Sequence, residues 1–224
     1  MNQAGPNIAV LAGATGLVGA SCLRELLASP RFQHVVILVR RRVDFEHPKL
    51  EQIVTEYRGR VGLPDITGGV FLCALGTTIK KAGSQEVFRR VDCEIPFALA
   101  REALLCGARG VAVVSSVGAN ADSSTFYLKV KGEMEEGIRG LGYSSVDIFR
   151  PSLLMGDRQE SRPGERAGIA VAKALQGMFV GGLSKYRPIE AADVARAMVK
   201  AAGDAKPGER VWHWAEMRKA LGER

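Results

Sequence analysis

The sequence predicts a doubly wound α/β fold, in which a parallel β-sheet lies between two layers of helices. Three observations indicate it. Short apolar runs recur up to Phe149, segments with helical spacing separate them, and a glycine-rich turn follows the first run. Strands buried on both faces are apolar along their whole length, and right-handed crossovers place each connecting helix over the sheet. The expected architecture is three-layer α/β/α with a small C-terminal elaboration.

The first part of the chain predicts strand, turn, helix and strand. Residues 7–12 form a short apolar run that ends in glycine, and residues 17–28 then show helical spacing closed by Ser29 and Pro30. Residues 35–39 are a continuous apolar run rich in β-branched side chains. Residues 52–57 form a weaker strand candidate.

The same rhythm continues through the middle of the chain. Residues 69–75 and 111–115 repeat the buried-strand pattern, and residues 146–149 give a weaker version of it. Helical patterns at residues 84–106 and 124–139 separate these strands. The alternation predicts parallel strands joined by helical crossovers.

The strand rhythm fades after Pro151. Residues 158–166 are polar and contain Pro163 and Gly164, which indicates a loop, whereas residues 167–176 and 191–202 have helical spacing. These segments are too short for an independent substrate domain. We therefore expect one domain over residues 1–224, with residues 152–190 and 203–224 forming an elaboration on the substrate side.

Composition limits the class of protein. The chain has 224 residues, of which 46% are hydrophobic and 25% charged, and no apolar run is long enough to span a membrane. We expect a folded, soluble, cytoplasmic protein without a membrane partner. The four cysteines and three histidines are scattered, so neither a disulfide framework nor a metal site is predicted. The net charge of +7 favours anionic ligands.

The first turn has the spacing of a dinucleotide-binding site. Glycine is needed where the backbone turns sharply and approaches a diphosphate, and the following helix directs unpaired N–H groups at that diphosphate. A glycine-rich turn used only for helix–sheet packing is the alternative. The predicted cofactor-binding residues of this turn are Gly13, Thr15, Gly16, Leu17, Val18 and Gly19.

The end of the second strand distinguishes the two nicotinamide cofactors. An acidic residue there would bind the adenosine ribose, whereas arginine accommodates a 2′-phosphate. Arg40 and Arg41 follow Val39, and no carboxylate appears before Asp44. NADP(H) is therefore preferred, with NAD(H) as the alternative. A solvated basic edge or a nucleic-acid contact is the rival interpretation, but the run is short and lacks interleaved aromatic residues, so no nucleic-acid partner is expected.

A candidate catalytic set lies at the carboxyl edge of the predicted sheet. Tyr127 and Lys131 are four residues apart and project from one helix face, and Ser115 and Ser116 end the fifth strand. Hydride transfer to a carbonyl leaves an alkoxide that needs a proton, and positive charge near a phenol favours the phenolate needed for the reverse reaction. We assign Tyr127 as acid/base, Lys131 as its tuning cation and Ser116, rather than Ser115, as the group that holds the carbonyl oxygen. The alternative for Tyr127 and Lys131 is a surface pair on an amphipathic helix.

Several motifs together resemble the atypical short-chain dehydrogenase/reductases, and over most of the chain the Tat-interacting-protein oxidoreductase-like branch. They are the segments 13–19, 73–78, 81–83, 115–119, 127–133, 149–151 and 157–165. The resemblance implies an NADP(H)-binding Rossmann domain with serine, tyrosine and lysine in the roles given above. It also implies cofactor contacts by the loop after the fourth strand and by the segment after the sixth, which nominates Leu75, Gly76, Thr77, Pro151 and Leu153.

Two functions remain open at this level. The first is an NADP(H)-dependent oxidoreductase that acts on a small carbonyl or alcohol. The second is an NADP(H)-binding redox sensor or protein-interaction regulator with little turnover, since the branch includes regulatory members and the substrate region is short. In the loop 157–165, Arg158 or Arg162 could bind a substrate anion, or the loop could brace the last helices. Relatives often form helix-mediated dimers, but nothing in the spacing here demonstrates a homodimer.

Overall fold

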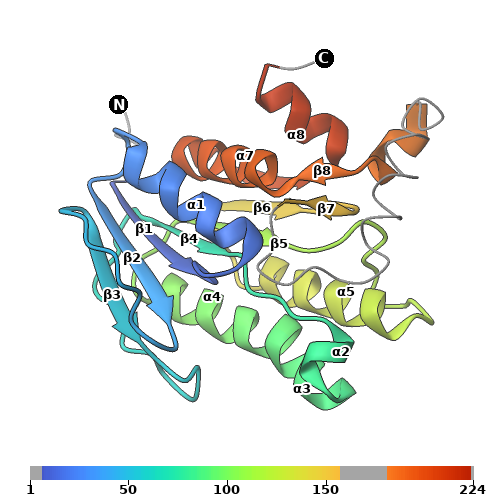
Figure 1. Ribbon diagram of the computed structural model, residues 1–224, viewed down its shortest axis with the longest axis horizontal. Helices are drawn as coiled ribbons and strands as arrows, with labels where there is room; N and C mark the ends of the chain where they lie inside the picture. Colours follow the sequence, from blue (N-terminus) through green and yellow to red (C-terminus); the bar gives the residue numbers. More distant parts are fainter. Residues whose placement is uncertain (1–6, 157–180, 223–224) are drawn as a thin grey trace.

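A seven-stranded parallel sheet forms the centre of the computed structural model, which describes residues 7–156 and 181–222 (Figure 1). The strand order is β3-β2-β1-β4-β5-β6-β9, and every neighbouring pair is parallel. The strands are β1 (Ile8–Ala12), β2 (His34–Val39), β3 (Leu50–Val54), β4 (Val70–Cys73), β5 (Gly110–Val114), β6 (Ser145–Phe149) and β9 (Gly208–Trp212). The predicted doubly wound fold is confirmed.

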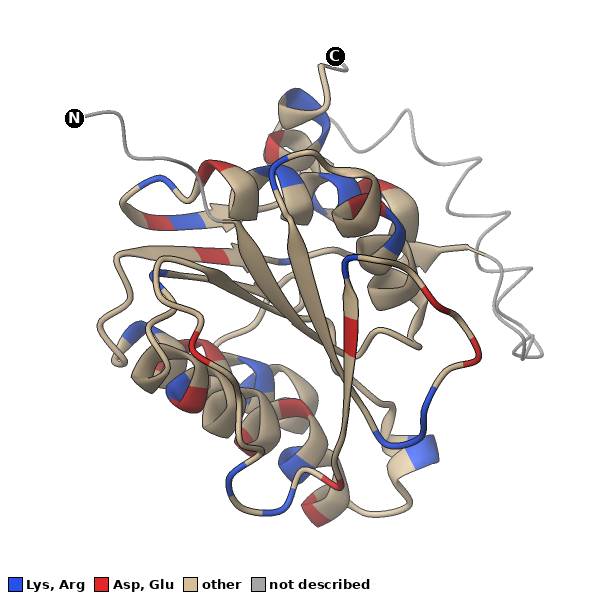
Figure 2. Cartoon of the chain, turned by 90° about the vertical axis from the view of Figure 1, so that its left-hand side faces the viewer, with Lys and Arg blue, Asp and Glu red and all other residues tan. Residues whose placement is uncertain are grey.

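Helices cover both faces of this sheet. Helices α1 (Leu17–Ala28) and α7 (Ala191–Asp204) pack on one face, and α4 (Ile95–Leu105) and α5 (Phe126–Arg139) lie on the other (Figure 1). Each face has its own apolar core, because alternate side chains of a strand point to opposite sides. Charged residues gather on the helices and loops, while the central strands carry few of them (Figure 2).

The order of the strands reverses between β1 and β4, so the crossovers leave β1 toward opposite sides. Open α/β sheets bind ligands in the crevice outside the carboxyl ends of the strands at this point. The turn after β1, the loop after β4 and the ends of β5 and β6 all meet there, because the strands are parallel. The topology therefore brings the predicted site segments to one edge.

Two elements differ from the sequence prediction. The weaker strand candidate at residues 52–57 is β3 at Leu50–Val54, and Tyr57 lies beyond it with φ 55° and its hydroxyl donating to the Leu38 carbonyl at 2.7 Å. The helix expected over residues 84–106 is divided into α3 (Gln85–Arg89), the π-helical turn η1 (Arg90–Glu94) and α4. Pro96 at the start of α4 lacks the N–H that a continuous α-helix would pair with the Asp92 carbonyl, which explains the interruption.

The C-terminal part adds short elements beside the sheet. They are a parallel pair made of β7 (Leu154–Met155) and β8 (Ile189–Glu190), the 3₁₀ turn η3 (Gly181–Tyr186) and helix α8 (Trp214–Ala220), while α2 (Ile79–Ala82) follows β4. Segment 203–224, expected on the substrate side, supplies β9 of the main sheet. The predicted helix at 191–202 is α7, whereas the predicted loop 158–166 and helix 167–176 lie outside the described residues.

A buried carboxylate explains why the β6 pattern is weaker in the sequence. Asp147 is 2% exposed and accepts hydrogen bonds from Arg210 Nε at 2.7 Å and Trp212 Nε1 at 2.8 Å, both on β9. The Trp212 ring stacks on Phe149 at 5.3 Å, so it packs the core. Asp147 therefore pairs β6 with β9 through side chains as well as through the backbone.

The described residues contain neither a membrane-spanning helix nor a group of side chains that could hold a metal ion. Within residues 7–156 and 181–222 no helix has the length and apolar character needed to cross a membrane. In the same ranges no group of three or more His, Cys, Asp or Glu side chains is placed to hold a metal ion.

Candidate functional site

The turn between β1 and α1 packs closely against backbone, its own and that of the loop after β4. Gly13 has φ +87°, and a Cβ atom there would lie 2.6 Å from the Ala74 carbonyl carbon. At Gly19 a Cβ atom would lie 1.9 Å from the Gly13 carbonyl oxygen. Side chains at either position would push apart the turn, α1 and the loop after β4. Gly16 caps α1 without a side-chain hydrogen bond, so no capping side chain satisfies the N–H groups of the first helical turn.

The other predicted residues of the turn divide into two groups. Thr15 and Gly16 are exposed on this turn. Val18 is 5% exposed and packs with Leu17 into the core beneath α7, so these two residues offer a ligand their backbone rather than their side chains.

Arg40 and Arg41 lie where the cofactor prediction requires them. Both follow β2 directly, at the carboxyl edge of the strand next to β1, and both are exposed. Arg40 is near enough to Tyr57 to oppose the effect of burial, which raises the pKa of that phenol to about 12. Their guanidinium groups are therefore available to a phosphate at this edge.

The loop after β4 lies against the glycine turn. Ala74 N donates to the Ala12 carbonyl at 2.9 Å, and a Cβ atom at Gly13 would lie 2.7 Å from Leu75 N. Thr77 N donates to Asp92 Oδ2 at 2.8 Å, which ties the loop to the π-helical turn η1. Of the predicted residues, Leu75 therefore lies against the glycine turn, while Gly76 and Thr77 lie beside Asp92.

Lys131 is buried in an ion pair that the sequence analysis missed. Its side chain is 5% exposed, and its Nζ lies 2.8 Å from Oδ1 of Asp92, which is 1% exposed. Burial alone would lower the pKa of Lys131, but the Asp92 carboxylate and Tyr127 outweigh it and raise that pKa above its ordinary value. Tyr127 stands one turn earlier on α5, partly exposed, with its ring 5.6 Å from that of Phe88. The interpretation of Tyr127 and Lys131 as a surface pair is therefore wrong for the lysine.

The two serines after β5 have different surroundings. Ser115 is 4% exposed and its Oγ donates to Glu135 Oε1 at 2.5 Å, so its hydroxyl is committed inside the protein. Ser116 is half-buried, and its Oγ has only a long contact of 3.4 Å to the Val117 carbonyl. Ser116 is the serine with a hydroxyl available to a ligand.

The segment after β6 runs beside these serines. The Pro151 carbonyl accepts from Val117 N at 3.0 Å, and the Leu153 carbonyl accepts from Ile189 N at 3.0 Å. Pro151 therefore lies at the serine end of the site, and Leu153 connects it to β8. The loop 157–165, with Arg158 and Arg162, lies outside the described residues.

Glu135 on α5 holds this helix to the residues that follow β5 and β6. It is fully buried on α5, and its two oxygens accept from Arg150 Nε at 2.9 Å, Arg150 Nη2 at 2.5 Å and Arg139 Nη2 at 3.2 Å in addition to Ser115. Residues 127, 131 and 135 share one face of α5. Glu135 thus fixes the helix that carries Tyr127 and Lys131 to the ends of β5 and β6.

Asp92→Asn is expected to change how stability depends on pH. In the native protein the pKa of Lys131 is raised, so the ion pair stabilises the fold below the unfolded lysine pKa of about 10.4 and is lost as the pH rises through the native value. Without the carboxylate, burial would lower that pKa, and a buried ammonium would destabilise the variant by about 2 kcal/mol at pH 7. Urea unfolding should show that the free energy of unfolding of Asp92→Asn is lower than that of wild type at pH 7. The difference should become smaller as the pH approaches 10.

Glu133→Gln is the matched control for Asp92→Asn. Glu133 lies on α5 like Lys131 and pairs with Arg89 at partly exposed side chains. The difference in the free energy of unfolding between wild type and Glu133→Gln should stay constant from pH 7 to pH 10. A constant difference for Asp92→Asn as well would contradict the assignment of Asp92 as the group that keeps Lys131 charged.

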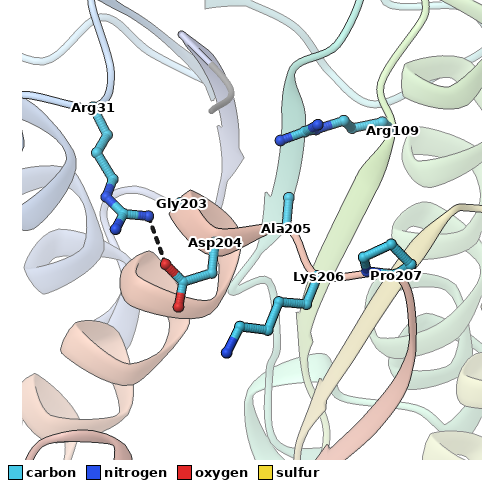
Figure 3. Close-up of a pocket in the computed structure, with 7 residues that line it drawn as sticks. All are labelled: Arg31, Arg109, Gly203, Asp204, Ala205, Lys206 and Pro207. Carbon is cyan, nitrogen blue, oxygen red and sulfur yellow. Dashed lines mark hydrogen bonds and ion pairs between the residues drawn. The ribbon is translucent and has the colours of Figure 1, made fainter. Parts of the chain in front are cut away.

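A separate hollow lies at the opposite, amino-terminal edge of the sheet (Figure 3). It has a volume of about 630 Å³ and is lined by Arg31, Arg109, Gly203, Asp204, Ala205, Lys206 and Pro207. Arg31 Nη1 lies 2.6 Å from Asp204 Oδ1. The cations of this lining are Arg31, Arg109 and Lys206. They lie around the C-terminus of α7, where positive charge stabilises the negative end of the helix dipole. The hollow is remote from the residues described above.

Relatives of known sequence share most of this chain. It is 35% identical over 204 residues to "Protein FMP52, mitochondrial" from Candida albicans, and the aligned region covers 88% of each chain. It is 34% identical over 220 residues to the Aspergillus fumigatus protein of the same name, covering 92% of this chain and 93% of that one. "Protein HTATIP2" from Rattus norvegicus is 37% identical over 158 residues, covering 68% of this chain and 65% of that protein.

Solved structures show the same fold. MoeE5 in complex with UDP-glucose and NAD has a TM-score of 0.65 at 18% identity and covers 96% of this chain and 82% of its own. The Bordetella bronchiseptica enzyme WbmH in complex with NAD⁺ has a TM-score of 0.67 at 15% identity and covers 93% of this chain and 75% of its own. No family model matches the sequence.

The relatives correct one prediction and confirm another. The cytoplasmic location expected from composition is contradicted, because the fungal relatives are named as mitochondrial proteins. The resemblance to atypical short-chain dehydrogenase/reductases is confirmed by HTATIP2 and by the NAD-bound structures. The chain therefore belongs to the family of the FMP52 proteins, within the atypical short-chain dehydrogenase/reductases of Rossmann fold.

Proposed function

We propose that this protein is an NADP(H)-dependent oxidoreductase that transfers hydride to or from a small carbonyl or alcohol. The observation that carries the proposal is the arrangement at one sheet edge, where the glycine turn after β1 contacts the loop after β4, and Asp92 joins that loop to Lys131 on α5, one turn after Tyr127. The mitochondrial names of the fungal relatives favour the mitochondrion as its location.

The residues present fit a dinucleotide. Glycine at positions 13 and 19 avoids the collision of a Cβ atom with the backbone of Ala74 and of Gly13, so the turn stays tight, and the first turn of α1 would direct N–H groups toward a diphosphate bound at this turn. Arg40 and Arg41 offer positive charge to an adenosine 2′-phosphate at the end of β2. Thr77 and Pro151 would border the nicotinamide half. When bound, the cofactor supplies or accepts the hydride.

The chain's own residues would handle the proton and the oxygen. The Tyr127 hydroxyl donates a proton to the alkoxide oxygen in reduction and takes it back in oxidation. Lys131, kept cationic in its buried site by Asp92, favours the phenolate between these steps. The Ser116 hydroxyl donates a hydrogen bond to the same substrate oxygen and orients the carbonyl.

A titration of the purified protein with NADPH and NADH tests the cofactor assignment. We expect NADPH to bind more tightly, and Arg40→Asp to weaken NADPH about tenfold with a much smaller effect on NADH, since the change places a carboxylate beside the phosphate. Arg101→Asp, on the exposed side of α4, is the control for the added negative charge. Equal affinities for both cofactors before and after Arg40→Asp would contradict the assignment.

A turnover screen separates the enzyme from a cofactor sensor. Aldehydes, ketones and quinones are each incubated with NADPH and the protein, and NADPH oxidation is followed by absorbance. An enzyme oxidises NADPH with at least one carbonyl class. A thermal shift with NADPH but no oxidation by any class would replace the enzyme with a sensor that binds the cofactor without turnover.

A further inference from the structure

Three cationic side chains and one imidazole lie at the carboxyl ends of β6 and β9, outside the acid/base set. Arg150 directly follows β6 and His213 directly follows β9, while Lys185 and Arg187 stand just before β8. We call these four residues the cationic cluster. They come from three separate segments of the chain, and the two strand ends belong to the ligand-binding edge of the sheet.

Arg187 is held beside the segment that follows β6. Ser152 Oγ donates to the Arg187 carbonyl, and Ile189 N donates to the Leu153 carbonyl at 3.0 Å. The Arg187 guanidinium carbon lies 4.7 Å from the centre of the Trp214 ring, which begins α8. Backbone and ring together orient this guanidinium, so little side-chain freedom remains to be lost when a ligand binds.

The carboxylates around the cluster are already engaged. Glu135 accepts from Arg150, Arg139 and Ser115, and Asp193 pairs with Arg196 and Arg218. Glu216 Oε2 accepts from His213 N at 3.0 Å.

Two cations of the cluster keep unused binding capacity. Over the described ranges, Lys185 and Arg187 have no carboxylate partner, and Arg187 Nε is buried without a hydrogen bond. Lys185 Nζ lies 5.3 Å from the centre of the Tyr186 ring. An unsatisfied buried donor is unfavourable, and an incoming oxygen acceptor at the guanidinium would relieve that cost.

We propose that Arg187, supported by Lys185, binds an anionic oxygen group of the substrate, a carboxylate or a phosphate. The guanidinium fork suits both, because either group can accept two parallel N–H bonds. The proposal rests on the proposed oxidoreductase function. It adds that the substrate carries a negative charge at the end remote from the carbonyl held by Ser116 and Tyr127.

His213 provides an independent signature of anion binding. Burial lowers the pKa of His213, Arg150 and Lys185 lower it further, and Glu216 and Glu135 act in the opposite direction. A bound anion would offset the positive charge of Arg150 and Lys185 and raise this pKa. Binding would then take up a proton, and the anion affinity would increase as the pH falls through the pKa of the imidazole.

Anion binding to the NADPH-saturated protein tests the proposal without turnover. Saturation occupies the cofactor's own phosphate sites. Inorganic phosphate and succinate are titrated separately by calorimetry in buffers of different ionisation enthalpy, which reports proton uptake. We expect one of them to bind the wild type with proton uptake and to bind Arg187→Gln about tenfold more weakly. The anion that binds identifies the class of substrate group.

Variants and controls separate this proposal from its alternatives. Arg187→Lys keeps the charge but loses the fork and should give an intermediate affinity, while Arg24→Gln on the exposed side of α1 should leave anion binding unchanged. Failure of both anions to bind the wild type, or equal binding by Arg187→Gln, would overturn the anion site. Failure of NADPH to bind would instead remove the proposed function, and the titration repeated on the cofactor-free protein would still decide the anion site.

Discussion

Tyr127→Phe is expected to lower the rate of hydride transfer about 10²- to 10⁴-fold while the affinity for NADPH stays within about twofold of wild type. The substitution removes one hydroxyl and leaves the ring, which packs 5.6 Å from Phe88. Lys131 keeps its ion pair with Asp92 at 2.8 Å, so the helix face is preserved. The loss should therefore fall on the proton-transfer step and not on cofactor binding.

The measurement is single-turnover oxidation of NADPH with a carbonyl substrate found in the screen. Tyr143→Phe is the matched control, since its hydroxyl donates to the Ala100 carbonyl at 2.5 Å between α4 and the loop before β6. That control should turn over like wild type. Wild-type rates in Tyr127→Phe would remove Tyr127 as the acid/base group.

Glu135→Ala is expected to destabilise the protein by about 3–5 kcal/mol, the range found when one partner of a buried ion pair is removed. The carboxylate is fully buried, and the change leaves Arg150, whose side chain is 20% exposed, without its partner. Ser115, 4% exposed, loses its acceptor as well. The free energy of unfolding from urea titration measures the effect.

Glu133→Ala on the same helix is the comparison for Glu135→Ala. Glu133 pairs with Arg89 at partly exposed side chains, and such pairs contribute about 1 kcal/mol or less. Equal losses in the two variants would show that Glu135 is an ordinary surface partner. A loss confined to Glu135 would support its role in joining α5 to the ends of β5 and β6.

The regular part of the fold could be predicted because its signal is local. The runs at β1, β2, β4 and β5 are apolar along their length, since both faces of the sheet are covered. The glycines of the first turn could be predicted for a related reason. Gly13 and Gly19 are required by backbone crowding that recurs wherever this turn occurs.

Asp92 and Glu135 could not be found this way. Each lies among charged residues in segments that have the pattern of exposed helix surface, and only the packing of η1 and α5 against the strand ends buries them. The sequence offered one indirect signal for Asp92, the proline at position 96 that interrupts the helix and produces the π-helical turn. The placement of Arg187 could not be predicted either, because Trp214 lies far from it in the sequence. In the structure the Arg187 guanidinium carbon lies 4.7 Å from the centre of the Trp214 ring.

The sequence by itself determined the alternation of strands and helices, the tight glycine turn after β1 and the tyrosine–lysine face of one helix. These depend on the spacing of neighbouring residues, which sets burial and direction along a single element. The tertiary structure alone decided that the Ser115 hydroxyl is hydrogen-bonded inside the protein, that Lys131 is buried with a carboxylate, and that Lys185 and Arg187 have no carboxylate partner within the described ranges. The physical reason is that the partners of a charged side chain come from distant segments of the chain, so only the folded structure shows whether it has one.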